Sequence, residues 1–503
     1  MQPLSHSNRN GFTIPFFGLA LVLLLCLDSP TSSCTDQEKG SLLQLLTGLS
    51  RDGGLTASWQ IDTDCCTWEG ITCNQDRTVT DVSLASRGLK GSISPFLGNL
   101  TSLLRLNLSQ NSLSGGLPPK LMSSSSILVL DISFNCLTGG LSELPSSTPA
   151  RSLQVLNISS NLFTGRFPST TWKVMKSLAV LKTSTNSFTG QIPTMPCVSA
   201  PSFAVLELSF NQLSGHIPRG LSNCLALKSL NAGYNKLSGT LPDELFKVTS
   251  LEHLSSPNNR LEGVLDGIIK LTNMITLDLG KNELSGNIPD SIGELKRLEE
   301  IHLGHNNMSG ELPSALSNCT NLITVDLKAN QVLGTTRSLT TLFIGFNFLH
   351  ETMPEDDSID GFENLHVLSM SYCSLSGTVP DWRDPQPICT LTNLQMLDLS
   401  SNHLAGKIPT ALNNLHYRLA LNNLEGPIPT ASQLSTFPDS SFHGNPKLCG
   451  PMIVNHCGSA EAGPESIISR EQIGSKVIFA TAFGAFFGVG VLYDQMVLAR
   501  YFG

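Results

Sequence analysis

Apolar and polar residues follow one repeating pattern along most of the chain. Between Val79 and Pro429 the order Leu-x-x-Leu-x-Leu-x-x-Asn-x-Leu-Ser-Gly-x-Ile-Pro returns with a period of about 24 residues. One copy runs from Leu103 to Pro118 and another from Leu277 to Pro289. Self-similarity at a fixed period predicts a stack of similar coils in place of several compact domains.

The asparagine of the pattern keeps its place through many copies. It recurs in steps of 23 to 26 residues at Asn111, Asn135, Asn161, Asn186, Asn211, Asn235, Asn259, Asn282, Asn306 and Asn330. It follows the Leu-x-Leu segment, where the chain is expected to leave a strand and turn. Its amide can therefore bond backbone groups that the turn would otherwise leave buried and unpaired.

The other residue types of the pattern predict the rest of the coil. The leucines of Leu-x-Leu point inward from a short strand and the x residues point outward, so stacked coils form a parallel sheet. Glycine permits a bend, and proline stiffens the return path on the convex side. We predict an α/β solenoid over residues 79–430, a right-handed leucine-rich-repeat superhelix of about 14 coils with a parallel concave sheet.

Two coils depart from the pattern. The step from Asn330 to Asn347 is only 17 residues, and the step from Asn402 to Asn422 is 20. These coils lack part of their return path, so we expect their joints to be strained or locally irregular. A shortened splice form or a gene-model error would produce the same two deletions.

The two ends of the chain predict its topology. Residues 1–33 carry Arg9, an apolar core from Phe12 to Leu27 and a small polar run, which is the pattern of a secretory signal peptide; an uncleaved membrane anchor is the alternative. Residues 477–493 are free of charge and predict a single transmembrane helix, which follows a juxtamembrane linker at 461–476 and leaves a short cytoplasmic tail at 494–503. This organisation predicts a single-pass type I protein of the plasma membrane with its N-terminus extracellular. Gly484 and Gly488 form a step that permits close helix packing, unless these glycines are merely tolerated in a span.

Charge, cysteine content and sequons are consistent with an extracellular location. The net charge is −9 and only 14% of residues are charged, which argues against nucleic acid as a partner. The chain has 13 cysteines, and Asn-x-Ser/Thr sequons predict glycosylation at Asn99, Asn107, Asn157, Asn307 and Asn318. A glycan at Asn107 or Asn157 would lie on the concave face. Repeat positions predict structural packing for Cys136, Cys224, Cys319 and Cys373, and leave Cys197 and Cys389 unassigned.

The segments at both ends of the array carry distinctive cysteine-containing motifs. The front holds Cys34, a helical stretch from Gln37 to Leu49, Trp59, and the run Asp64-Cys65-Cys66-Thr67-Trp68-Glu69-Gly70-Ile71-Thr72-Cys73. The back holds Gly444-Asn445-Pro446-Lys447-Leu448-Cys449-Gly450, followed by Cys457. With the Leu-Ser-Gly-x-Ile-Pro repeats, these segments resemble the plant leucine-rich-repeat receptor-like proteins that lack a kinase domain. Within that family, the motifs most resemble those of the receptors for tyrosine-sulfated peptides.

The resemblance implies caps, disulfides and a ligand class. It implies an N-terminal cap at 34–78 and a C-terminal cap at 431–460, with Cys34 paired with Cys65, Cys66 with Cys73, and Cys449 with Cys457. Receptors of the resembling branch carry an insert between late repeats that helps to hold the ligand. The nearest candidate, Asp381 to Thr390, is far too short, which puts inheritance of that ligand in doubt.

A ligand surface is expected on the outward positions of the concave strands. Successive coils place there a polar, mostly acidic strip formed by Thr276, Asp278, Glu300, His302, Thr324, Asp326 and Lys328. Such a strip suits a basic peptide or the polar rim of a partner, although exposed strand positions are also often simply solvated. Catalytic signatures such as Gly-x-Ser-x-Gly, Gly-x-x-x-x-Gly-Lys-Ser/Thr and His-Glu-x-x-His are absent from the sequence, so no enzyme activity, metal or cofactor is expected.

These expectations define a function and two alternatives. The chain is expected to bind an extracellular peptide or protein and to signal through a membrane-bound co-receptor kinase, since its short tail has no room for a kinase. The second possibility is an inhibitor or decoy that binds its target without signalling. A truncated, non-functional copy of a longer receptor is a third.

Overall fold

The computed structural model describes residues 34–333, 341–347, 365–379, 394–409, 416–429, 437–451 and 453–457. The chain divides into two units, Met1–Val454 and Asn455–Gly503, and all the helices and strands named below lie in the first. The predicted signal peptide, the juxtamembrane linker, the transmembrane helix with Gly484 and Gly488, and the tail fall outside the described residues. Within the described part, no helix combines the length and the apolar character needed to cross a bilayer.

A small cap covers the front of the array. It comprises α2 (Asp36–Thr47), β1 (Leu49–Arg51), α3 (Leu55–Ser58), η1 (Cys65–Thr67) and β2 (Ile71–Cys73). The side chains of Thr35 and Glu38 form a reciprocal capping box at the start of α2, which pairs backbone donors that the first turn leaves free. Glu38 also accepts a hydrogen bond from the N–H of Val79 at 3.0 Å, which joins the cap to the first coil. The rings of Trp59 and Trp68 stack with centroids 5.3 Å apart.

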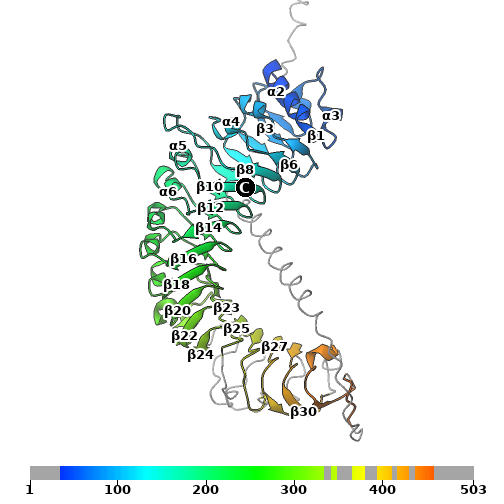
Figure 1. The fold of residues 1–503 in the computed structure, drawn as a ribbon, viewed down its shortest axis with the longest axis vertical. Helices are drawn as coiled ribbons and strands as arrows, with labels where there is room; N and C mark the ends of the chain where they lie inside the picture. Colours follow the sequence, from blue (N-terminus) through cyan, green and yellow to red (C-terminus); the bar gives the residue numbers. More distant parts are fainter. Residues whose placement is uncertain are drawn as a thin grey trace, which may run out of the picture. The chain divides into compact units, whose positions relative to one another are not determined.

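One long sheet lines the inner face of the coils (Figure 1). Every pairing in it is parallel except that of β2 with β3. Among the described residues its strands are, in spatial and chain order, β2, β3 (Val79–Ser83), β5 (Arg105–Asn107), β7 (Val129–Asp131), β9 (Val155–Asn157), β11 (Val180–Lys182), β13 (Val205–Glu207), β15 (Ser229–Asn231), β17 (His253–Ser255), β19 (Thr276–Asp278), β21 (Glu300–His302), β23 (Thr324–Asp326), β25 (Thr341–Phe343), β26 (Val367–Ser369), β27 (Met396–Asp398) and β29 (His416–Arg418). The predicted solenoid with a parallel sheet is confirmed.

A second sheet follows the ladder asparagines on a side wall of the stack. Its strands are β1, β4 (Lys90–Ser92), β6 (Ser112–Gly115), β8 (Cys136–Gly139), β10 (Leu162–Arg166), β12 (Ser187–Gly190), β14 (Gln212–Gly215), β16 (Lys236–Thr240), β18 (Arg260–Gly263), β20 (Glu283–Gly286), β22 (Asn307–Glu311) and β24 (Gln331–Leu333). Apart from β1, which belongs to the front cap, these strands lie just after the asparagine position of each coil, mostly in the Leu-Ser-Gly segment of the pattern. This stretch is therefore a strand where the sequence predicted only a bend.

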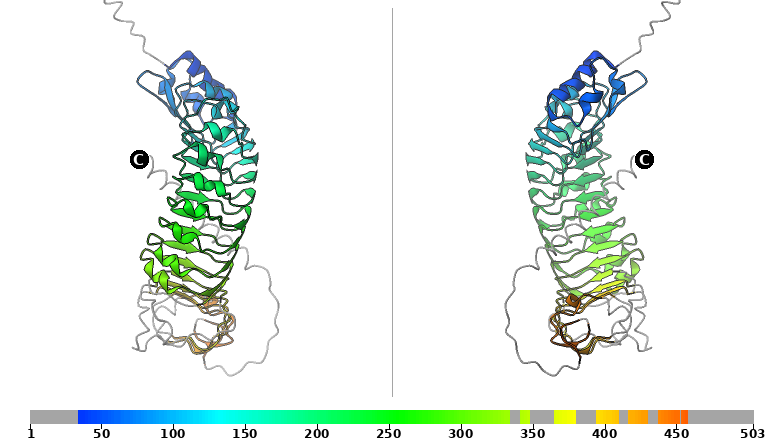
Figure 2. Two further views of the ribbon diagram at one scale, coloured as in Figure 1. Left: turned by 90° about the vertical axis from the view of Figure 1, so that its left-hand side faces the viewer. Right: turned by 90° about the vertical axis from the view of Figure 1, so that its right-hand side faces the viewer.

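Short helices complete the coils on the face opposite the long sheet, and Figure 2 shows the stack from its two sides. They are η2 (Pro95–Asn99), α4 (Pro119–Met122), α5 (Thr171–Val174), α6 (Met195–Ser199), η3 (Arg219–Asn223), η4 (Leu245–Lys247), η5 (Ile268–Lys270), η6 (Asp290–Glu294) and η7 (Ser314–Asn318). Towards the back, β28 (Ala405–Gly406), β30 (Asn423–Pro427) and β31 (Lys447–Cys449) form a third sheet, and η12 (Asp439–Ser441) precedes β31.

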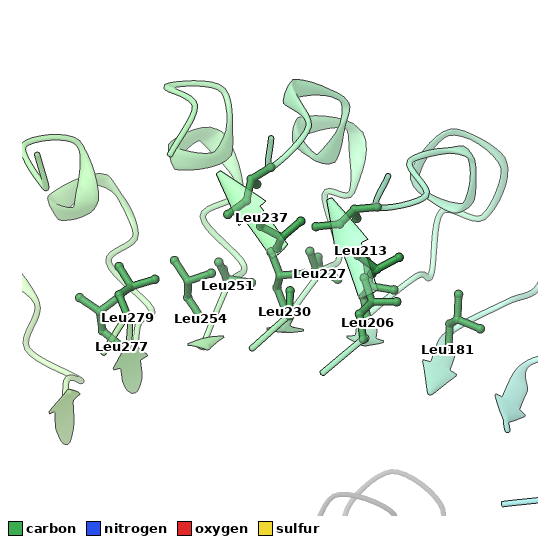
Figure 3. Packing of buried hydrophobic residues seen from close by; sticks show 14 of the residues in the cluster. Leu181, Leu206, Leu213, Leu227, Leu230, Leu237, Leu251, Leu254, Leu277 and Leu279 are labelled. Atoms are coloured by element: carbon green, nitrogen blue, oxygen red, sulfur yellow. The ribbon is translucent and has the colours of Figure 1, made fainter. Parts of the chain in front are cut away.

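The core is a column of leucines shared between neighbouring coils (Figure 3). Leu206, Leu230, Leu254 and Leu277 lie in register on four adjacent strands, and each is at most 1% exposed. Burying such a side chain contributes about 2 kcal/mol. Because each leucine is covered by the coils on either side, no single coil can bury its own apolar residues.

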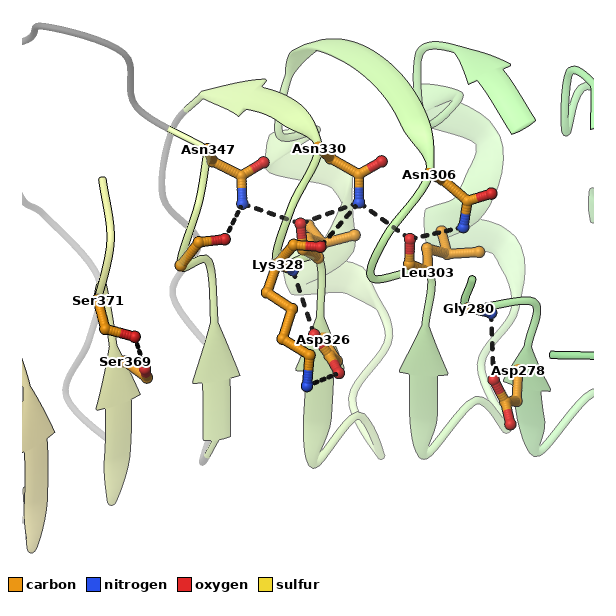
Figure 4. A network of polar contacts seen from close by, with 12 residues as sticks. Asp278, Gly280, Leu303, Asn306, Asp326, Lys328, Asn330, Asn347, Ser369 and Ser371 are labelled. Atoms are coloured by element: carbon orange, nitrogen blue, oxygen red, sulfur yellow. Dashed lines mark hydrogen bonds and ion pairs between the residues drawn. The ribbon is translucent and has the colours of Figure 1, made fainter. Parts of the chain in front are cut away.

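The asparagines form a continuous hydrogen-bonded ladder from coil to coil. Asn282 is representative: its Nδ2 donates to the carbonyls of Ser256 at 3.0 Å and Leu279 at 2.9 Å, and its Oδ1 accepts from the N–H of Leu261 at 3.0 Å. The Nδ2 atoms of Asn306, Asn330 and Asn347 likewise donate to carbonyls of their own and the preceding coil. Figure 4 shows both kinds of bond at Asn330. Every rung therefore holds two coils at a fixed spacing.

Two rungs were not foreseen. Asn445, in the back cap, donates to the carbonyls of Leu419 and Phe442 and accepts from the N–H of Leu424, so the ladder continues into the cap. Cys373 occupies the asparagine position of its coil, and its thiol lies 3.4 Å from the carbonyl of Ile344. Asn402 of the next coil then accepts from the N–H of Cys373 at 3.0 Å. A thiol thus takes the donor position of this rung.

The shortened coils affect the two sheets differently. The long sheet passes the first joint in register, with Thr324 opposite Thr341 and Thr341 opposite Val367, and it passes the second with Met396 opposite His416. On this side the expected irregularity is absent. Among the described residues the second sheet ends at β24, and pairing on that wall resumes with the bridge of Thr378 to Ala405. Strand pairing fixes the spacing on the inner face whatever the length of the return path.

The cysteines partly follow the predictions. Cys34 pairs with Cys65 and Cys66 pairs with Cys73, the two pairs that the resemblance implied, and Cys449 and Cys457 are both disulfide-bonded. The assignment of Cys224 to simple packing was wrong, because Cys224 pairs with Cys197 across neighbouring coils. Cys136 is exposed, which also contradicts a buried packing role, whereas Cys319 and Cys373 are buried. Cys389 lies outside the described residues.

We predict that Asn282→Ala lowers the free energy of unfolding by about 2–4 kcal/mol, since it leaves buried backbone groups of two coils unpaired. The midpoint of urea unfolding of the purified chain measures this loss. Asn287→Ala is the matched control, because Asn287 is exposed; it should change the value by less than about 0.5 kcal/mol. Equal effects of the two substitutions would contradict a stabilising ladder.

Candidate functional site

The seven residues of the predicted strip lie together on three neighbouring strands of the long sheet. Thr276 and Asp278 lie on β19, Glu300 and His302 on β21, and Thr324 and Asp326 on β23, with Lys328 two residues beyond. Parallel register aligns them in two rows: Thr276, Glu300 and Thr324 form one, and Asp278, His302 and Asp326 form the other. Adjacent strands are about 4.8 Å apart, so His302 is flanked by a carboxylate on each side.

Contacts within the strip hold these side chains in place. Asp278 accepts from the N–H of Gly280 at 3.2 Å and from the hydroxyl of Ser255 at 3.3 Å. Asp326 accepts from the N–H of Lys328 and forms an ion pair of 3.2 Å with the Lys328 ammonium (Figure 4). The imidazole Nε2 of His302 lies 3.6 Å from a Glu300 carboxylate oxygen.

The strip is less acidic than its composition suggests. Lys328 offsets one of the three carboxylates, and protonated His302 offsets a second. One net negative charge remains when His302 is protonated, and two remain when it is neutral. The surface therefore combines a modest negative charge with many hydrogen-bonding groups.

Protonation of the strip is coupled through His302. Burial disfavours the charged imidazole, but the hydrogen bond with Glu300 and the charges of Asp278, Glu300 and Asp326 outweigh burial and raise the pKa of His302 above its usual value of 6.5. Burial raises the pKa of Asp278 above 3.8, and the nearby His302 only partly opposes this.

The outward surface beside the strip also includes residues that the sequence prediction missed. Ser255 and Phe343 occupy the same register position as Asp278 on their strands, and Phe343 lies 6.0 Å from the Lys328 ammonium, within range of a cation–π contact. His253 lies beside Thr276, and its pKa is lowered chiefly by burial. Reading the outward positions coil by coil would have found Ser255 and His253. The 17-residue step hid Phe343, because it breaks the period.

The predicted glycosylation sites fall into two groups. Asn107 and Asn157 lie at the ends of β5 and β9 on the long sheet, and Asn157 Nδ2 donates to Asp131 and Ser133. Asn99 and Asn318 lie at the ends of short helices and Asn307 begins β22, so these three are away from the long sheet.

The titration of His302 provides a test of this geometry. Because its folded pKa is raised, protonation of His302 stabilises the fold below the unfolded pKa, and this contribution is lost as pH rises through the folded pKa. We expect NMR titration to place His302 above 6.5 and His305 below it, since burial and the charges of Lys328 and Lys281 lower the pKa of His305. Glu300→Gln should lower the pKa of His302 and leave that of His305 unchanged. A His302 pKa at or below 6.5 would contradict the alignment of carboxylates around it.

Comparison with known families identifies the class of fold. The family model described as leucine rich repeat N-terminal domain matches residues 35–74. The model described as leucine rich repeat matches residues 102–124, 152–173, 202–224, 226–248, 273–295, 297–319, 364–382 and 393–415. The chain is therefore a leucine-rich-repeat protein.

Similar sequences come from plant receptors. Three from Arabidopsis thaliana are a leucine-rich repeat receptor-like serine/threonine-protein kinase (37% identical over 92 residues, 18% of this chain and 8% of the kinase), Receptor-like protein 3 (38% over 76 residues, 14% and 9%) and Phytosulfokine receptor 2 (34% over 94 residues, 18% and 9%). The aligned segments thus span less than a tenth of each relative. Plant leucine-rich-repeat receptor-like proteins and phytosulfokine receptors are homologues of this chain, which confirms the resemblance seen in the sequence.

Solved structures of plant receptors have a similar fold. A structure described as a plant peptide hormone receptor, RGFR1 in complex with RGF2, is 28% identical with a TM-score of 0.57, over 73% of this chain and 66% of that one. The crystal structure of a TDR receptor is 29% identical with a TM-score of 0.62, over 73% and 64%.

Proposed function

We propose that the chain is a cell-surface receptor-like protein that binds an extracellular peptide or protein on the strip of β19, β21 and β23 and signals through a partner receptor kinase. The observation that supports it most is the in-register row of Asp278, His302 and Asp326 on a sheet whose spacing is fixed by the ladder. A rigid row of charged and hydrogen-bonding groups can be matched by an extended ligand without reordering the protein, which lowers the entropic cost of binding.

The charge of the strip selects a class of ligand. The net negative charge suits a peptide with a lysine, an arginine or a free amino group, and the open sheet suits an extended chain. The likeness to a receptor solved with its peptide hormone supports this class of ligand. The polar hydroxyls of Thr276 and Thr324 add hydrogen-bonding capacity beside the charged row.

Charge reversal tests the site. The glycosylated chain, displayed on cells and incubated with extracellular fluid, should retain a defined set of peptides that mass spectrometry identifies. We expect the triple variant Asp278→Lys, Glu300→Lys, Asp326→Lys to lose them, with affinity falling at least about a hundredfold because attraction becomes repulsion.

The matched control is Asp266→Lys with Glu311→Lys, two exposed carboxylates away from the long sheet. This control should bind as the unmodified chain does. Unchanged binding by the triple variant, with a normal unfolding profile, would contradict the assignment of the ligand to this strip.

Membrane association tests the signalling part of the proposal. A chain carrying a C-terminal tag should stay with the membrane fraction through carbonate extraction, and its tag should be accessible only from the cytoplasmic side. Signalling through a partner kinase requires both. Release of the chain to the medium would instead favour an inhibitor or decoy.

Glycan placement is a further consequence. We expect occupancy at Asn307 and Asn318, which are exposed, and none at Asn157, whose Nδ2 hydrogen bonds a glycan would disrupt. Glycopeptide mass spectrometry of the cell-surface chain measures this. Full occupancy at Asn157 would place a glycan on the long sheet and contradict an open inner face there.

A further inference from the structure

One position of the repeat carries a long side chain in a single coil. The position lies two residues beyond the end of each strand of the long sheet. In the described coils from β3 to β29 it is alanine, serine, glycine or proline, except after β23, where it is Lys328. The coils on either side have Gly304 and Gly345 there. The turn thus forms with a small residue elsewhere, and the lysine calls for another reason.

The Lys328 ammonium lies within reach of a carboxylate and an aromatic ring. It is 3.2 Å from Asp326 Oδ2 and 6.0 Å from the centroid of the Phe343 ring. Asp326 and Phe343 are register partners on β23 and β25, so adjacent strands present the two groups side by side. A carboxylate and an aromatic face both attract ammonium and guanidinium groups. The acidic strip therefore ends in a formed cation subsite that a residue of the chain itself fills.

The preceding coil leaves room for this ion pair. A Cβ added at Gly304 would lie 2.8 Å from Asp326 Oδ1 and 3.1 Å from Lys328 Cγ, so both side chains lie against the backbone of Gly304. The Lys328 side chain is 43% exposed, whereas that of Asp326 is 15% exposed (Figure 4). Ion pairs with an exposed partner contribute little to stability. Another cation can therefore replace Lys328 at a small cost to the fold.

Two other coils hold an aspartate at the position of Asp326 without a lysine. Asp131 accepts from the N–H of Ser133 at 3.0 Å and from its hydroxyl at 2.7 Å. Asp398 is held in the same way by the serine two residues further on, at 3.0 and 2.6 Å. At Asp326, Oδ1 accepts from the N–H of Lys328 at 3.2 Å, and Oδ2 faces the ammonium. A serine in place of Lys328 should thus hold Oδ1 and leave Oδ2 to an incoming cation.

We propose that Lys328 occupies, in the free chain, a subsite for a cationic side chain of the ligand, which displaces it from Asp326 and Phe343. This inference rests on the proposed function, because it assigns one subsite to the basic ligand of the strip. Lys328 is tethered beside the subsite, so it competes at a high effective concentration. A lone basic group is therefore bound weakly, and the chain selects ligands that also gain contacts elsewhere on the strip.

A synthetic peptide measures this competition. The peptide Ser-Lys-Ser-Lys-Ser-Lys-Ser, acetylated at its N-terminus and carrying an uncharged dye at its C-terminus, has lysines at alternate positions, which face the same side of an extended chain. Fluorescence anisotropy with the purified full chain at low ionic strength follows its binding. We expect Lys328→Ser to bind the peptide about tenfold more tightly than the unmodified chain, since the competitor is removed. The same peptide with acetylated lysines should bind neither chain.

Further substitutions show whether the gain comes from the subsite. Added to Lys328→Ser, Asp326→Asn should remove the gain, and Phe343→Leu should reduce it about threefold because the cation–π contact is lost. The matched control is Lys281→Asn, which removes a positive charge from an exposed position two coils away. Asparagine tolerates the φ of 52° at that position. This control should tighten binding by less than about twofold.

The outcomes separate the subsite from a purely structural ion pair. Lys328→Ser should melt at the temperature of the unmodified chain, since serine already holds Asp131 in this way. No gain with Lys328→Ser, an equal gain with Lys281→Asn, or a gain that survives Asp326→Asn would overturn the proposal. Absence of saturation with both the unmodified chain and Lys328→Ser up to about 1 mM would overturn it as well. The proposed function fails separately, if the triple charge reversal leaves binding of the extracellular peptides unchanged.

Discussion

The bond between each ladder asparagine and the backbone of the preceding coil is the constraint on which the rest of this structure depends. Asn282 joins the carbonyls of two coils and accepts an N–H of the earlier one, and rungs of this kind continue as far as Asn445. The leucines supply most of the favourable free energy, and the amides act together with the backbone pairing of the strands to hold the coils in register. Fixed register aligns Asp278, His302 and Asp326 in one row.

The same rung sets the character of the sheet edge. It requires a left-handed residue before the asparagine, and that residue points to solvent in many coils. The ladder thus accompanies both the register of the acidic inner strip and the backbone conformation at the edge of the same sheet. A solenoid can present such a surface along its whole length without any moving part.

Much of the fold followed from the sequence because its signals are local and periodic. Regular spacing predicts the Leu-x-Leu strands and the asparagine rungs. The motif of the front cap, through its resemblance to known proteins, implies both front disulfides. The features that the sequence did not reveal either break the period or use a different residue type at a repeat position. The pairing of Cys197 with Cys224 depends on how two return paths meet in space, and Cys373 replaces a rung with a different donor. The strip residues were found because outward positions alternate with leucines, but Lys328 compensating Asp326 and the flanking of His302 needed the register between strands.

Hydrogen exchange of the intact glycosylated chain tests the central claim most directly. If one ladder runs through the stack, the backbone amides of β19 to β27 should exchange slowly as a single block, with no break at the short step between Asn330 and Asn347. Fast exchange of β25 and β26 beside a protected β23 would show that the ladder ends at the short coil, and would contradict the continuous stack on which the acidic strip rests.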